Sequence, residues 1–75
     1  MHALKHAAMA GQVTPLLNEN AIPPEHLPKA RAWFQRRMDY YAAKHGTAWP
    51  DTREWIADYI NEELREHLES KGVSA

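Results

Sequence analysis

The chain has 75 residues, a formal net charge of −1 and no cysteine. A chain this short forms one domain, residues 1–75, and the missing cysteines exclude a disulfide framework, a thiolate zinc site and a thiol nucleophile. No apolar run approaches the roughly 18 residues that a membrane span requires, so we expect a cytoplasmic protein without a membrane segment.

Two short helices are predicted in the first third of the chain. An alanine-rich helix spans about residues 3–10 and ends near Gly11, a residue type suited to a helix C-terminus. Thr14 and Pro15 then form a typical helix start, with a capping hydroxyl followed by proline, and predict a helix over about residues 15–21.

Two long helices are predicted in the remainder. The first covers about residues 28–45 and stops at Gly46, and the second covers about residues 52–70. Asp51, with Glu54 three residues later, predicts a capping box at the start of the second helix.

Each long helix carries an apolar face when its residues are placed at helical spacing. On the first helix that face consists of Ala30, Trp33, Phe34, Met38 and Tyr41. On the second it consists of Trp55, Ile56, Tyr59, Ile60, Leu64 and Leu68. We therefore predict an all-α fold: a small bundle of three main helices plus one short helix, with the two C-terminal helices forming an antiparallel amphipathic pair and a frayed tail at 71–75. Arg37 and Glu63 fall inside the two faces, and we predict a contact between them.

The charges are divided between the two long helices. Residues 28–46 hold five Lys and Arg against one Asp, a balance of +4, whereas residues 47–75 hold seven acids against three bases, a balance of −4. One flank of the first long helix combines bases with rings, which can contact phosphates and stack on a nucleic-acid base. Its members are Lys29, Trp33, Arg36, Tyr40 and Lys44. The alternative is that these charges border the core and offset the acidic helix.

A second feature also bears on nucleic acid. The stretch "AAMAGQVTPLLNENAIP" resembles the helix-turn-helix of phage and plasmid repressors, and "IPPEHLP" is similar to the segment after the recognition helix in some Cro-like repressors. The resemblance implies a small DNA-binding regulator. It departs from that pattern at Gln12, where the turn normally has an apolar residue, and at Glu19, which would repel phosphate.

The acidic helix and the aromatic residues favour a protein partner instead. The outer face of the last helix carries Glu54, Asp58, Glu62, Glu66 and Glu69. Three tryptophans and three tyrosines are more than so small a core hides, and exposed rings often anchor interfaces. We expect Trp49 to be partly exposed. Our preferred hypothesis is a regulatory or accessory protein that binds another protein, or a second copy of itself.

Catalysis and metal binding find little support. The two serines, Ser70 and Ser74, lie in the tail, and carboxylates four apart on an acidic helix are typical of a solvated face. His2 and His6 are four apart, but no third ligand lies near them in sequence. We therefore expect no enzyme activity, no cofactor and no bound metal.

Overall fold

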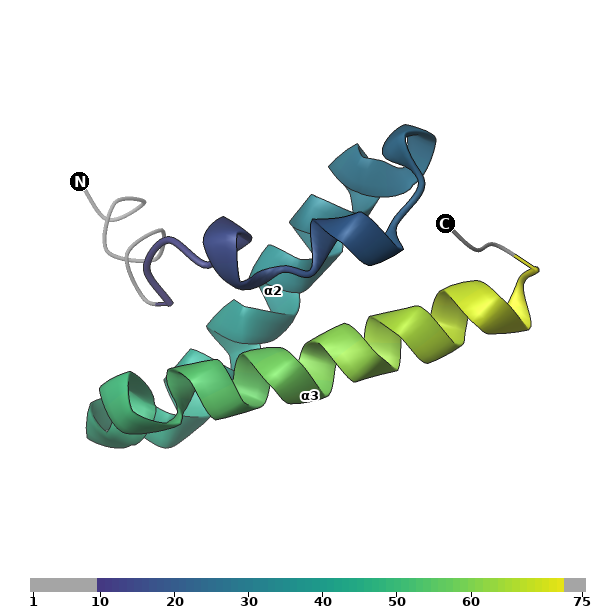
Figure 1. Ribbon diagram of the computed structural model, residues 1–75. Coiled ribbons are helices and arrows are strands. Elements are labelled where there is room, and N and C mark those ends of the chain that lie inside the picture. The colour runs from purple at the N-terminus through teal and green to yellow at the C-terminus, as the bar shows by residue number, and fades with distance from the viewer. Residues whose placement is uncertain (1–9, 73–75) are drawn as a thin grey trace.

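The computed structural model describes residues 10–72, and this part of the chain is mostly helical, without strands (Figure 1). Two long helices dominate it: α2, Leu27–His45, and α3, Trp49–Ser70. Single 3₁₀ turns make up the remainder, η1 at Thr14–Leu16, η2 at Glu19–Ala21, η3 at Pro24–His26 and η4 at Gly46–Ala48.

The predicted helical fold is confirmed, but the predicted three-helix bundle is wrong. Between Pro24 and Ser70 the described chain is almost continuous helix, folded back once at η4 so that α2 and α3 pack against each other. The helix predicted over residues 3–10 lies outside the described residues, apart from Ala10, which is buried at a bend.

The helix pair is held in place by its turn. Gly46 ends α2 with φ 55° and ψ −123°, and its N–H bonds the carbonyl of Ala42, which confirms the predicted stop signal. α3 begins three residues before the predicted start, because Pro50 occupies the first turn, where its missing N–H needs no partner. The capping box at Asp51 is wrong, since the residue before α3 is Ala48 and no side chain caps it.

The helix predicted over residues 15–21 is also wrong. Turns η1 and η2 are separated by Leu17, whose backbone is extended, and by Asn18, whose backbone is not helical either. Helices this short are unstable without tertiary support, and Pro23 disfavours helical geometry at the residue before it. Residues 10–26 instead form an irregular segment that runs along the helix pair (Figure 1). We call these residues the N-terminal segment.

One apolar cluster joins the N-terminal segment to both helices. The segment supplies Ala10, Val13, Leu17 and Ile22; α2 supplies Ala30, Phe34, Met38 and Ala42; α3 supplies Trp49, Ile56, Ala57, Ile60 and Leu64. Phe34, Met38, Ile60 and Val13 are the largest side chains fully removed from solvent. The segment thus takes the place in the core that a third helix would have filled.

Candidate interaction surface

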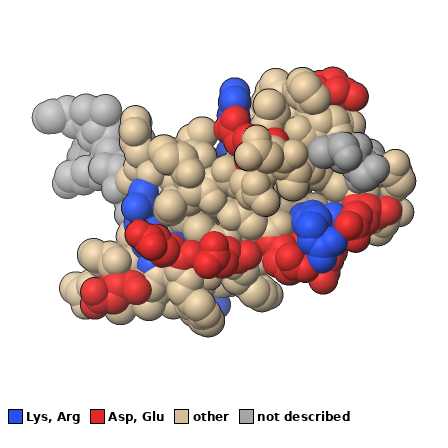
Figure 2. Space-filling model, in the orientation of Figure 1, with Lys and Arg blue, Asp and Glu red and all other residues tan. Residues whose placement is uncertain are grey.

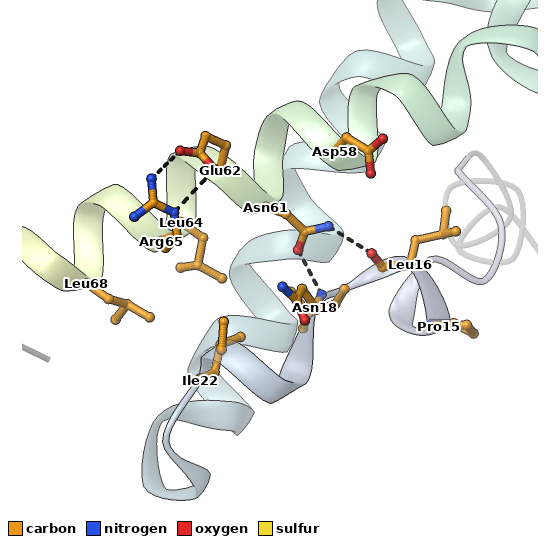
Figure 3. A pocket seen from close by; sticks show the side chains of 12 residues that line it. Pro15, Leu16, Asn18, Ile22, Asp58, Asn61, Glu62, Leu64, Arg65 and Leu68 are labelled. Carbon is orange, nitrogen blue, oxygen red and sulfur yellow. Dashed lines mark hydrogen bonds and ion pairs between the residues drawn. The ribbon is translucent and has the colours of Figure 1, made fainter. Parts of the chain in front are cut away.

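One side of the helix pair is occupied by the N-terminal segment. The Asn61 side chain on α3 bonds the segment's backbone twice, its Nδ2 donating to the Leu16 carbonyl at 2.9 Å and its Oδ1 accepting from the Asn18 N–H at 2.8 Å (Figure 3). Arg53 donates to the carbonyls of Ala10 and Gln12. Leu64 and Leu68 line the hollow of about 400 Å³ beside these contacts, together with residues of the segment (Figure 3).

The opposite side of the pair carries exposed rings. Trp55 and Tyr59 each lie two residues from an α3 residue that binds the segment, and residues two apart point to different sides of a helix. Tyr40, Trp55 and Tyr59 are 50%, 66% and 53% exposed, and they are the large apolar side chains exposed within residues 10–72. With half-buried Trp33 and Tyr41 they form one surface, which we call the aromatic face.

Arg37 lies at the centre of the aromatic face. Its guanidinium is 5.3 Å from the ring centroid of Tyr41 and 5.8 Å from those of Trp33 and Tyr40. Nη2 also donates to Glu63 on α3 at 3.2 Å, which confirms the predicted contact. Both side chains remain about one-third exposed, at 32% and 36%, so water screens the pair and its contribution to stability is small.

Ring-to-ring contacts continue this surface from α2 to α3. Tyr41 meets Tyr59 edge-on with centroids 6.4 Å apart, and meets Tyr40 in the same manner at 5.2 Å. The Nε of Arg37 is buried without a hydrogen-bond partner, the one such side-chain atom in the part of the chain described. The guanidinium is therefore held both by the rings around it and by the bonds that Nη2 donates to the Tyr41 hydroxyl and to Glu63.

Two expectations about the rings are wrong. Trp49 is buried, 6% exposed, and its Nε1 donates to the Ala10 carbonyl at 3.3 Å. Because α3 begins at Trp49, this residue falls on the buried stripe with Ile56 and Ile60. Conversely, Trp55 and Tyr59 fall on the predicted apolar face but lie beside that stripe, since within residues 10–72 α3 packs mainly against α2, with further contacts to the turns η1 and η4.

The acidic residues of the last helix form a row beside the aromatic face. Glu54, Asp58, Glu62, Glu66 and Glu69 are all exposed, and Figure 2 shows carboxylates following one another along α3. Arg65 pairs with Glu62 and with Glu69, and its hydrogen bond lowers the pKa of the Glu62 carboxyl. No ion pair involves the other three within residues 10–72. The row therefore keeps a net negative charge.

The predicted basic flank divides into two parts. Lys29, Trp33 and Arg36 line one groove of about 440 Å³ between the start of α2 and the end of α3. The groove also receives His26, His67 and Lys71, and its lining contains no carboxylate. Sequence reasoning missed these three because they lie on other elements. Lys44 and Tyr40 lie further along α2, where the Lys44 Nζ donates to the Tyr40 hydroxyl at 3.1 Å.

Other kinds of site are not found in the described residues. Residues 10–72 contain no group of three or more potential metal ligands, and none of their helices is long and apolar enough to span a bilayer. His2 and His6 lie outside this range. No protein-family model matches the chain, and no curated protein or solved structure matches it.

Proposed function

We propose that this protein is a non-enzymatic accessory or regulatory protein that binds another protein through the aromatic face and the adjoining acidic row. The exposure of Trp55 and Tyr59 is the observation that carries this proposal. Burying two such rings against a partner removes a large apolar area from water, and Trp and Tyr are the residues that most often dominate binding energy.

The charged surroundings support the same role. The acidic row lies along one edge of the exposed rings, so it would attract a partner with a basic surface and orient it over them. The centre of the face is already ordered, because Arg37 is held by Tyr41 and Glu63. An ordered surface loses less conformational entropy on binding than a mobile one.

Site-specific photo-crosslinking tests this function. A photoreactive phenylalanine analogue replaces Trp55 in one variant and Glu25 in a matched control, since Glu25 is exposed in η3 and belongs to neither surface. We expect a discrete protein adduct from position 55 in cells that produce the protein, and none from position 25. Equal crosslinking at both positions, or none at 55, would show that the aromatic face is not an interface.

A second candidate function is nucleic-acid binding, and the groove at Lys29 and Arg36 favours it. Three Lys and Arg side chains gather there with Trp33 and two histidines, without a carboxylate. Phosphates and one stacked base would match this combination. The helix-turn-helix does not add to it, because no recognition helix forms within residues 10–26.

Fluorescence anisotropy of a labelled mixed-sequence duplex, titrated with the protein at about 50 mM and about 200 mM salt, tests the second candidate. Phosphate contacts predict saturable binding that weakens steeply at the higher salt and is lost in Arg36→Glu but kept in Glu25→Gln. Absence of binding at the lower salt would exclude this function.

A further inference from the structure

We propose that the aromatic face binds a second copy of this chain, forming a two-fold dimer in which α2 of each copy lies over α3 of the other. This inference rests on the proposed function, because it names the partner of the same surface. It follows from the distribution of charge along the two edges of that surface.

The two edges have opposite charge. Along the α2 edge, exposed Arg36 and Lys44 follow one another beside Trp33 and Tyr40. Lys29 lies nearer the start of α2, level with Lys71, and is not counted in this edge. Along the α3 edge, exposed Glu62 and Glu66 follow Trp55 and Tyr59 at helical spacing. A surface that is basic on one edge, aromatic in the middle and acidic on the other is complementary to itself after a half-turn.

The direction of the two-fold axis follows from this pattern. Two copies placed face to face can be related by either of two two-fold axes in the plane of the interface. One axis runs parallel to the helices, midway between α2 and α3, and the other runs perpendicular to both helices. The first puts α2 of one copy over α3 of the other, so that bases meet acids. The second puts α2 over α2 and α3 over α3, so that like charges meet, which is unfavourable. The charges therefore select the first axis.

The contacts inside one copy show which residues would meet. Arg37 pairs with Glu63, so these two lie at the same height along the helices. After the half-turn, Arg36 of one copy lies near Glu66 of the other copy. Glu66 is one helical turn along α3 from Glu63, the residue that is level with Arg37. Tyr41 and Tyr59 likewise share a height, which brings Lys44 over the exposed ring of Trp55. Cation–π contacts between Lys and Trp are favourable. The result is a four-helix arrangement with all five rings inside.

Analytical ultracentrifugation of the full chain over a range of concentrations tests the dimer. We expect a monomer–dimer equilibrium for the wild-type protein and a dissociation constant raised at least about tenfold in Arg36→Glu and in Glu66→Arg, because each substitution turns two attractive pairs into two repulsive ones. Glu25→Arg, a charge reversal away from the face, should leave the equilibrium unchanged.

Mixing the two weakened variants gives the decisive result. In a heterodimer of Arg36→Glu with Glu66→Arg, both cross-copy pairs again join opposite charges, so the mixture should associate more tightly than either variant does alone. Circular dichroism of each variant checks that it is folded. A wild-type chain that remains monomeric, or a mixture that does not associate, overturns the dimer. A crosslink from position 55 to a different protein would then show that the proposed function holds with another partner.

Discussion

The backbone N–H of Asn18 donates a 2.8 Å hydrogen bond to the side-chain Oδ1 of Asn61, 43 residues later in the chain. The same amide group donates through Nδ2 to the carbonyl of Leu16. A single side chain on α3 thus satisfies two backbone groups that the irregular N-terminal segment does not satisfy itself. The side-chain amide of Asn61 therefore joins a segment without regular secondary structure to the helix pair.

Replacing Asn61 with alanine should therefore loosen the N-terminal segment. The partly buried Leu16 carbonyl and the N–H of exposed Asn18 would both lose their partner, and we expect the free energy of unfolding to fall by about 1–3 kcal/mol. Urea denaturation followed by circular dichroism measures this change. Asn20→Ala serves as the control, because Asn20 is exposed and its side chain makes no hydrogen bond to any residue from 10 to 72. Equal stability of the two variants would contradict the bridging role.

Trp49 and Trp55 should respond differently to the same substitution. Trp49→Phe removes the hydrogen bond to Ala10 but keeps most of the buried ring, so we expect a loss of about 1 kcal/mol. Trp49→Ala should cost about 3–5 kcal/mol through the cavity it leaves. Trp55→Phe, at a 66% exposed position, should change stability by less than about 0.5 kcal/mol. Thermal denaturation of the three variants distinguishes these outcomes.

The ion pair between Glu19 and Arg31 should make docking of the N-terminal segment sensitive to acid. The bidentate hydrogen bonds from Arg31, at 2.8 and 3.0 Å, lower the pKa of the Glu19 carboxyl below its ordinary value of 4.5. A carboxyl whose folded pKa is depressed stabilises the fold above its unfolded pKa, and this contribution is lost as the pH falls through the folded value.

The measurement is the urea midpoint of the wild type and of Glu19→Gln from about pH 6 to about pH 3. At about pH 6 the wild type should be more stable than Glu19→Gln. The difference in urea midpoint between the two proteins should shrink as the pH falls towards about 3. A difference that stays constant with pH would show that the ionised carboxylate does not contribute. Glu25→Gln, at an exposed position, controls for general charge effects.

Gly46 should tolerate a D-residue better than an L-residue. Its φ of 55° with ψ of −123° is strained for L-amino acids, and a Cβ there would meet no atom within 4 Å. Gly46→Ala should therefore cost at least about 1 kcal/mol through backbone strain alone. D-alanine at this position, introduced by chemical synthesis, reverses the steric preference and should be neutral or stabilising. Equal destabilisation by both enantiomers would mean that space, not backbone conformation, limits this position.

Local signals in the sequence were sufficient for α2 and its stop. The predicted range 28–45 differs from Leu27–His45 by one residue, because Pro28 and Gly46 act on the backbone directly and need no distant partner. The Arg37–Glu63 contact was also predictable, since two charged residues placed inside facing apolar stripes have few other partners. The segregation of basic and acidic residues between the two long helices is likewise a property of the sequence.

Tertiary structure decided the N-terminal segment and the exposed rings. Thr14 and Pro15 have the pattern of a helix start, yet the region between them and Pro23 is too short to sustain a helix, and Asn61 stabilises an extended backbone instead. Trp49 is buried and Trp55 is exposed for two reasons. α3 begins at Trp49, and only a narrow stripe of α3 residues faces the core. Composition and spacing determined that this chain forms amphipathic helices with opposite charges. Only packing determined which side the N-terminal segment covers, because that choice depends on contacts between residues more than 40 positions apart.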